Sequence, residues 1–193
     1  MPNRYLDTAQ RQMREAALDT AESDVLAGGW KSLQMRSIAV RIGVSRQTLY
    51  NAFTDKHGLA EALILRLTHR FLDGIEAAVD RADTEHDRWA AVIRYTLATA
   101  ETEPLLRAAL IGADRGEFLP LLTSESTPIL LVARERLVAA FLRHHPDLDP
   151  RTVADTAETV TRLALSHIVL ATQPPARVAQ HVADLATALA ATR

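Results

Sequence analysis

A short segment around residue 48 is dense in side chains that can donate or accept hydrogen bonds. Its polar or amphipathic members are Arg46, Gln47, Thr48, Tyr50 and Asn51. Ser45 precedes them and is a favourable N-cap, so we expect a helix that runs from Ser45 to about Ala52. A helix with so many hydrogen-bond donors and acceptors can enter the major groove, where base edges present a distinct pattern.

The residues before this helix are expected to support it. Met35 to Ile42 shows helical spacing of apolar residues, and Gly43 can adopt positive φ in a turn. Val44 and Leu49 are apolar and would lock the second helix against the first. Helix, short turn with glycine and second helix is the helix-turn-helix arrangement. The alternative is two short helices of an ordinary bundle with a solvated face.

The rest of the chain is also predicted to be helical, because no segment alternates with the period of a strand. Further helices are expected at residues 7–26, 55–81, 87–102, 105–112, 129–143, 150–171 and 176–190, with 116–127 irregular. Thr54 or Asp55, Thr127 and Asp149 are the expected N-caps of three of them. We therefore predict an all-α fold of about nine helices.

Composition narrows the possible functions. The chain has 193 residues, a net charge of −2 and no cysteine, which excludes disulfides, thiolate metal sites and a catalytic cysteine. Neither a secretion signal nor a membrane-spanning apolar run is present, so we expect a cytoplasmic protein with no membrane partner. Common enzyme motifs are absent, and His144 and His145 are neighbours that make a poor metal pair. We expect no enzyme activity, no cofactor and no metal.

Residues 29–59 resemble the N-terminal DNA-binding domain of the TetR (tetracycline repressor) family. The matching pieces are Ile38-Ala39, Gly43-Val44-Ser45, Thr48-Leu49-Tyr50, Phe53 and Lys56. The sequence departs from the family pattern in three places. Ala52 stands where His or Tyr is frequent, Gln34 replaces the usual Thr or Ser, and the opening helix has about one extra turn between Ala16-Ala17 and Gly29. The remainder of the chain resembles the family in length and helical layout, so the resemblance implies a helix-turn-helix DNA-binding domain at 1–54 and a helical ligand-binding and dimerisation domain at 55–193.

The resemblance implies roles for individual residues. Arg46, Gln47 and Asn51 would contact base edges, and an arginine–guanine pair would discriminate most strongly. Phosphate contacts, which position the domain without specifying sequence, would come from Arg36, Ser37, Thr48, Tyr50 and Lys56. Ser45 belongs to the same predicted DNA-binding set.

The resemblance also implies a homodimer that binds a palindromic operator. The interface would use the last two helices, at about 150–171 and 175–191, although these faces could instead belong to one monomer's core. A small, mainly apolar ligand would release the operator by moving the long helix at 55–81. The candidate ligand-binding residues are Trp89, Arg94, Tyr95, Phe118, Phe141, Thr161 and His167. Each also has a plainer interpretation as a core or solvated residue.

Two alternatives remain open at this point. One is an all-helical ligand-binding bundle or enzyme that does not bind DNA. The other is a transcriptional activator of the same fold. Sequence-specific DNA binding would exclude the first, whereas only the response of a target promoter separates the second from a repressor.

Overall fold

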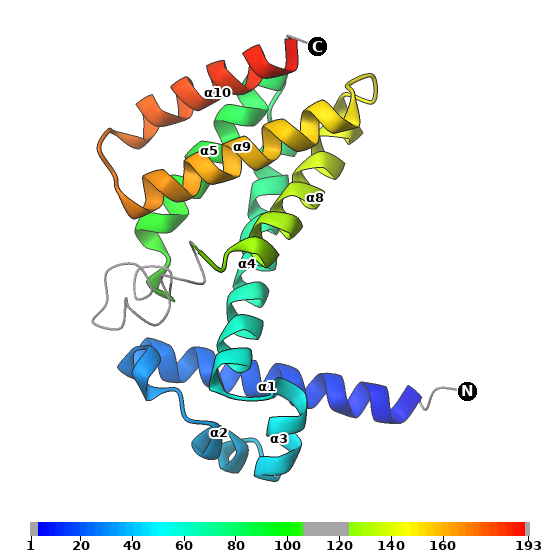
Figure 1. Ribbon diagram of the computed structural model, residues 1–193, viewed down its shortest axis with the longest axis vertical. Helices are drawn as coiled ribbons and strands as arrows, with labels where there is room; N and C mark the ends of the chain where they lie inside the picture. Colours follow the sequence, from blue (N-terminus) through cyan, green and yellow to red (C-terminus); the bar gives the residue numbers. More distant parts are fainter. Residues whose placement is uncertain (1–3, 106–123, 192–193) are drawn as a thin grey trace. The chain divides into compact units, whose positions relative to one another are not determined.

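The computed structural model describes residues 4–105 and 124–191 of the chain. Its elements are α1 (Arg4–Gly28), the 3₁₀ helix η1 (Trp30–Ser32), α2 (Met35–Arg41), α3 (Arg46–Phe53), α4 (Lys56–Asp80), α5 (Glu85–Thr102), α8 (Thr127–His144), α9 (Pro150–Val169) and α10 (Pro175–Ala191) (Figure 1). These described ranges contain no strand, which confirms the predicted all-α class. Apart from Leu105, the helix expected at 105–112 lies outside the described residues.

The chain forms two compact units. Unit 1 comprises residues 4–66 with 104–105, and unit 2 comprises 67–103 with 124–191, counting only described residues. The helix α4 contributes residues 56–66 to unit 1 and residues 67–80 to unit 2. The domain boundary at residues 54 and 55 stays a prediction.

Local sequence signals explain the helix-turn-helix of unit 1. Ser45 caps α3, because its hydroxyl accepts a hydrogen bond from the backbone N–H of Thr48 at 3.0 Å. Gly43 has φ of 74°, the left-handed region that the turn requires. Leu49 is fully buried and holds α3 against the rest of the unit. Gln34 makes no side-chain cap at the start of α2, as its amide lacks the short reach of serine or threonine.

Within unit 1, ion pairs of one α4 arginine join α1 to α4. The guanidinium of Arg66 lies 2.7 Å from the carboxylate of Asp19 and 2.6 Å from that of Glu22. Glu15 is a more distant partner, at 3.4 Å. The ion pair with the exposed Asp19 adds little stability. The ion pair with the half-buried Glu22 is short and less screened by solvent, so it contributes more. Arg66 therefore fixes one face of α1 against residues 56–66 of α4.

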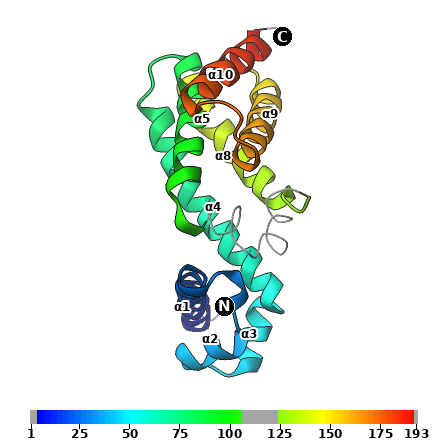
Figure 2. The ribbon, with the colours of Figure 1, turned by 90° about the vertical axis from the view of Figure 1, so that its left-hand side faces the viewer.

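Unit 2 is a helical bundle with an apolar core. The helix α10 packs along α5 and α9, and α8 packs along α9 (Figures 1 and 2). Asp149 caps α9 as predicted, with a hydrogen bond of 2.9 Å from the backbone of Thr152. The prediction of Thr127 as an N-cap is wrong by one residue. The carbonyl of Ser126 already accepts a hydrogen bond from Leu130, so Thr127 is the first helical residue.

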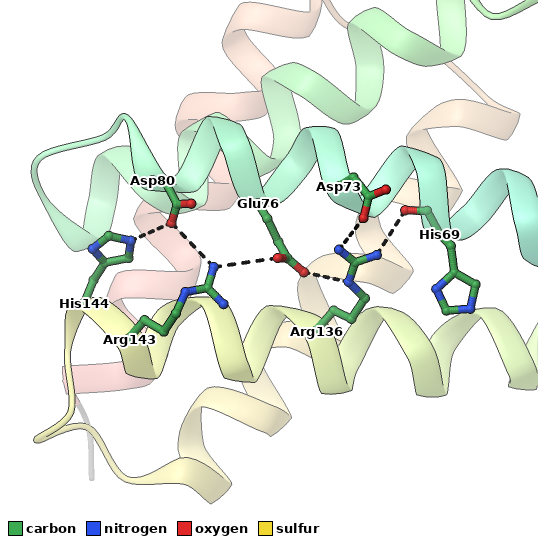
Figure 3. Close-up of polar contacts among 7 residues, drawn as sticks. All are labelled: His69, Asp73, Glu76, Asp80, Arg136, Arg143 and His144. Carbon is green, nitrogen blue, oxygen red and sulfur yellow. Dashed lines mark hydrogen bonds and ion pairs between the residues drawn. The ribbon is translucent and has the colours of Figure 1, made fainter.

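Ion pairs also join the C-terminal part of α4 to α8 (Figure 3). Arg136 donates through Nε to Glu76 and through Nη2 to Asp73, each at 2.6 Å. It also donates to the backbone carbonyl of His69 at 3.0 Å. A forked guanidinium held on three acceptors has little freedom to rotate. This contact, the Arg136 clamp, therefore fixes α8 to residues 67–80 of α4.

The far end of the same helix pair carries a histidine contact. His144 Nε2 lies 2.8 Å from Asp80 Oδ1, and Arg143 approaches the same carboxylate at 3.5 Å. The hydrogen bond from His144, together with the positive charge of Arg143, holds the pKa of Asp80 below its ordinary value. The ionised carboxylate of Asp80 therefore stabilises the folded state.

We expect Asp80→Asn to lower stability at pH 5 and to lose this effect in acid. The folded-state pKa of Asp80 lies below that of the unfolded chain, so its contribution is complete above about pH 4 and disappears as the pH falls through the folded-state pKa. Because the pair is exposed, the free-energy difference at pH 5 should be below about 1 kcal/mol. Urea unfolding of both proteins from pH 5 to 3 measures it. A difference that stays constant over this range would contradict the assignment.

Candidate nucleic-acid interface

The helix α3 separates an apolar face from a polar one. Leu49 and Phe53 are buried within unit 1, which leaves the remaining positions to point outward. Ser45, Arg46, Gln47, Thr48 and Asn51 are exposed, and Tyr50 is half-buried. The structure therefore brings these predicted residues together on one exposed surface.

Side chains on this surface are ordered by contacts along the helix. The Arg46 guanidinium lies 5.6 Å from the centre of the Tyr50 ring, within the range of a cation–π contact. Gln47 donates a hydrogen bond of 2.8 Å to the side-chain oxygen of Asn51. This leaves the Gln47 carbonyl as an acceptor and the Asn51 amide as a donor, the pair of functions that an adenine edge requires.

The first turn of α2 adds positive charge and a hydroxyl. Arg36 and Ser37 are both exposed there, as the predicted phosphate contacts must be. Val40 lies one turn further on and keeps 74% of its surface exposed, although it is not among the residues predicted to contact DNA. The helical spacing of the sequence already indicates that Val40 is exposed, because it lies off the apolar face formed by Met35, Ile38 and Ala39.

The start of α4 carries the last predicted DNA contact. Lys56 is the first residue of α4 and is half-buried. Asp55 caps this helix, since its Oδ1 accepts a hydrogen bond of 2.9 Å from the backbone of Gly58. The helix N-terminus and the lysine place positive charge at the same point, where a phosphate would be favoured.

The predicted ligand-binding residues occupy different surroundings in unit 2. Trp89 and Phe141 are fully buried and stack at 3.9 Å between ring centres. Tyr95 is half-buried and lies 5.5 Å from the ring of Phe71. A Cβ on Gly74 would overlap the Tyr95 hydroxyl, so the absence of a side chain there lets the tyrosine cross α4.

The other predicted ligand-binding residues are more scattered. Thr161 donates its hydroxyl to the carbonyl of Ala157, one turn earlier in α9. His167 is half-buried and Arg94 is exposed. Phe118 lies outside the described residues. A ligand role for this set stays a prediction.

Metal sites and membrane-spanning helices were sought in the described ranges, 4–105 and 124–191. No group of three or more histidine, aspartate or glutamate side chains is arranged to hold a metal ion there. Within the same ranges, no helix is both long and apolar enough to cross a membrane.

The fold and the polar surface of α2 and α3 define a helix-turn-helix DNA-binding protein. Residues 17–63 match the family model described as bacterial regulatory proteins of the tetR family. Residues 86–188 match the model described as the C-terminal domain of the bacterial tetracyclin repressor. The chain belongs to the TetR family of DNA-binding transcriptional regulators, which confirms the family and the regulatory function predicted from the sequence.

Individual relatives agree with this membership. The chain is 28% identical to the HTH-type transcriptional regulator AlkX of Mycobacterium tuberculosis over 187 residues, which cover 96% of this chain and 89% of the relative. It is 33% identical to the HTH-type transcriptional repressor KstR of Mycolicibacterium smegmatis over 110 residues, or 54% and 52% of the two chains. These relatives are transcriptional regulators.

A solved structure extends the similarity to the fold. The TetR family repressor AlkX from Dietzia sp. strain DQ12-45-1b, implicated in biodegradation of n-alkanes, has a TM-score of 0.74 and 27% identity. The superposition covers 91% of this chain and 94% of that one. Both units of the chain therefore have counterparts in a known repressor.

Proposed function

We propose that this chain is a repressor that binds a palindromic operator as a homodimer and dissociates when a small, mainly apolar ligand binds unit 2. The observation that carries the DNA-binding part is the exposed polar face of α3, held by Ser45 at one end and by the buried Leu49 and Phe53 beneath. Relatives named repressors support the direction of regulation.

The proposed contacts divide into two groups. Arg46, Gln47 and Asn51 contact base edges and specify sequence. Phosphates are contacted by Thr48 and Tyr50 of α3 and by its N-cap Ser45. Further phosphate contacts come from Arg36 and Ser37 of α2 and from Lys56 of α4. Phosphate contacts should carry most of the affinity for unrelated DNA and most of its dependence on salt.

The proposed dimer interface lies on α9 and α10. Leu185 and Leu189 are one turn apart on α10 and keep 56% and 45% of their surfaces exposed. Leu170, at the end of α9, is 68% exposed. A second copy that covered these leucines would remove apolar surface from water, which favours association. A dimer also presents two copies of α3 to two half-sites of a palindrome.

We expect Leu185→Glu to convert the dimer to a monomer. The glutamate would place a charge in an apolar interface, where it would lose its hydration without gaining a partner. Analytical ultracentrifugation at about 10 μM should show twice the 21.2 kDa chain mass for the wild type and a single chain mass for the variant. Leu131→Glu is the matched control, since Leu131 is 58% exposed but lies on α8. A dimeric Leu185→Glu protein, or a monomeric wild type, would rule out this interface.

The proposed ligand is apolar because most of the buried side chains of unit 2 are apolar. The buried polar side chains among its described residues are Arg88, Thr96, Ser126, Thr152 and Thr156. Its buried apolar set is composed of Leu, Ile, Val and Ala with Trp89 and Phe141, and Tyr95 packs against it. The similarity to a repressor implicated in n-alkane biodegradation supports an alkane or an alkane-derived compound. The Arg136 clamp gives a route for the response, because a ligand that displaces α8 also displaces residues 67–80 of α4. By reciprocity, operator DNA must then weaken ligand binding by the same factor.

A promoter test separates the proposal from its alternatives. The operator is cloned upstream of a reporter gene, and dodecane, dodecan-1-ol and dodecanoate are added in turn, with resorcinol as a polar control. A repressor lowers the reporter signal, and at least one of the dodecyl compounds restores it. A signal that rises when the protein is expressed would indicate an activator. Binding of dodecyl compounds without any DNA binding would indicate a ligand-binding bundle.

A further inference from the structure

The C-terminal end of α3 is held by a residue from α1 that lies outside the predicted DNA-binding set. Arg14 donates through Nη1 to the backbone carbonyl of Ala52. Its guanidinium also lies over the ring of Phe53, 4.5 Å from the ring centre. Arg14 is half-buried, and all three residues belong to unit 1.

Both contacts suit the end of a helix. The last carbonyls of a helix lack partners within the helix and carry partial negative charge, so a cation is favoured there. The planar guanidinium can stack on an aromatic ring while its N–H groups donate to a nearby acceptor. Lysine offers a point charge and cannot do both with one rigid group.

The start of α4 also contacts this end of α3. A Cβ on Gly58 would overlap the carbonyl oxygen of Phe53, so α4 begins in direct contact with the end of α3. Thr54 joins them with φ of 66°, a strained conformation for a residue other than glycine. The end of α3 is therefore contacted both by Arg14 and by the first turn of α4.

From this arrangement we propose that Arg14 is a positioning residue for DNA recognition: it sets the tilt of α3 and thereby places Asn51 against its base. The inference rests on the proposed role of α3 in contacting bases. Ser45 and the Gly43 turn anchor the N-terminal end of α3, so loss of Arg14 frees the C-terminal end most. Asn51 is adjacent to the Ala52 carbonyl that Arg14 holds, whereas Arg46 lies at the other end of the helix.

The test compares base preferences at each operator position. Wild type, Arg14→Gln, Asn51→Ala and Arg46→Ala are each used to select bound sequences from a random duplex pool, and affinities are then measured at several salt concentrations. Arg14→Gln should lose preference at the base pairs where Asn51→Ala loses it and keep the preference that depends on Arg46. Its operator affinity should fall by about 5- to 150-fold, the range that one base contact carries. Its affinity for unrelated DNA and its salt dependence should match those of the wild type.

Two further variants keep the test decisive. Arg11→Gln removes an exposed arginine one turn earlier in α1 and should leave every measurement unchanged. Arg14→Lys retains the charge but loses the planar guanidinium. Its base preference and operator affinity should therefore lie between those of the wild type and of Arg14→Gln. It replaces Arg14→Gln in the test if that variant does not fold.

Other outcomes would overturn the proposal. Equal loss of affinity on all sequences, with a salt slope reduced by about one, would make Arg14 a phosphate contact. An unchanged base-preference profile in Arg14→Gln would show that Arg14 does not position Asn51. If the folded wild type selects no sequence, the proposed function fails first, and the inference fails with it.

Discussion

Replacing Arg46 by alanine is expected to lower operator affinity by about 5- to 150-fold, or about 1–3 kcal/mol, while affinity for unrelated DNA changes much less. The guanidinium is exposed on α3 and is the one side chain of the proposed base-contacting set that can donate two parallel hydrogen bonds to guanine. Its loss should therefore flatten sequence preference at one base pair of each half-site. Fluorescence anisotropy with operator and scrambled duplexes measures both affinities.

Two variants distinguish a base contact from general charge attraction. Arg46→Lys keeps the positive charge but not the fork, so it should lose most of the preference while keeping the affinity for scrambled DNA. Tyr50→Ala should weaken binding to both duplexes, because the proposed contact of Tyr50 is to phosphate. If Arg46→Ala and Tyr50→Ala lowered both affinities equally, the division into base and phosphate contacts would be wrong.

Replacing Trp89 by alanine is expected to destabilise unit 2 by about 3–5 kcal/mol, the cost of deleting a large buried aromatic side chain. Trp89 is 1% exposed and stacks on Phe141, which is itself fully buried. Its deletion would leave a cavity between α5 and α8 and remove the stacking contact. Urea unfolding followed by circular dichroism should show a transition at lower urea than in the wild type.

Tryptophan fluorescence distinguishes destabilisation of unit 2 from destabilisation of unit 1. The chain has two tryptophans, so Trp30 of unit 1 remains as the fluorescent reporter in Trp89→Ala. Trp89→Phe is the matched control and should retain most of the stability, since it keeps an aromatic ring against Phe141. A cost below about 1 kcal/mol for Trp89→Ala, well under the range for a packed core residue, would indicate that Trp89 does not serve mainly as core.

The sequence predicts best what is decided locally. The caps at Ser45 and Asp149, the positive φ of Gly43 and the bounds of α4 follow from residue types within a few positions of each other. The N-cap of α8 differs by one residue, because Ser126 and Thr127 are both acceptable N-caps and the backbone hydrogen bonds decide between them.

Long-range side-chain contacts could not be predicted in the same way. Arg14 and Ala52 are 38 positions apart, and Arg136 and Glu76 are 60 apart. Which arginine meets which acceptor depends on how helices pack, and helical periodicity carries no information about that. The same limit applies to Trp89 and Phe141: apolar spacing places them inside a helical bundle, but core packing and ligand contact require the same residue types.

Selection of bound sequences from a random duplex pool, at moderate salt and with folding checked by circular dichroism, tests the central claim most directly. The account predicts enrichment of an inverted repeat whose half-sites lie about one helical turn apart, or a multiple of it, because two copies of α3 must enter successive major grooves. A folded protein that enriches no sequence would contradict it.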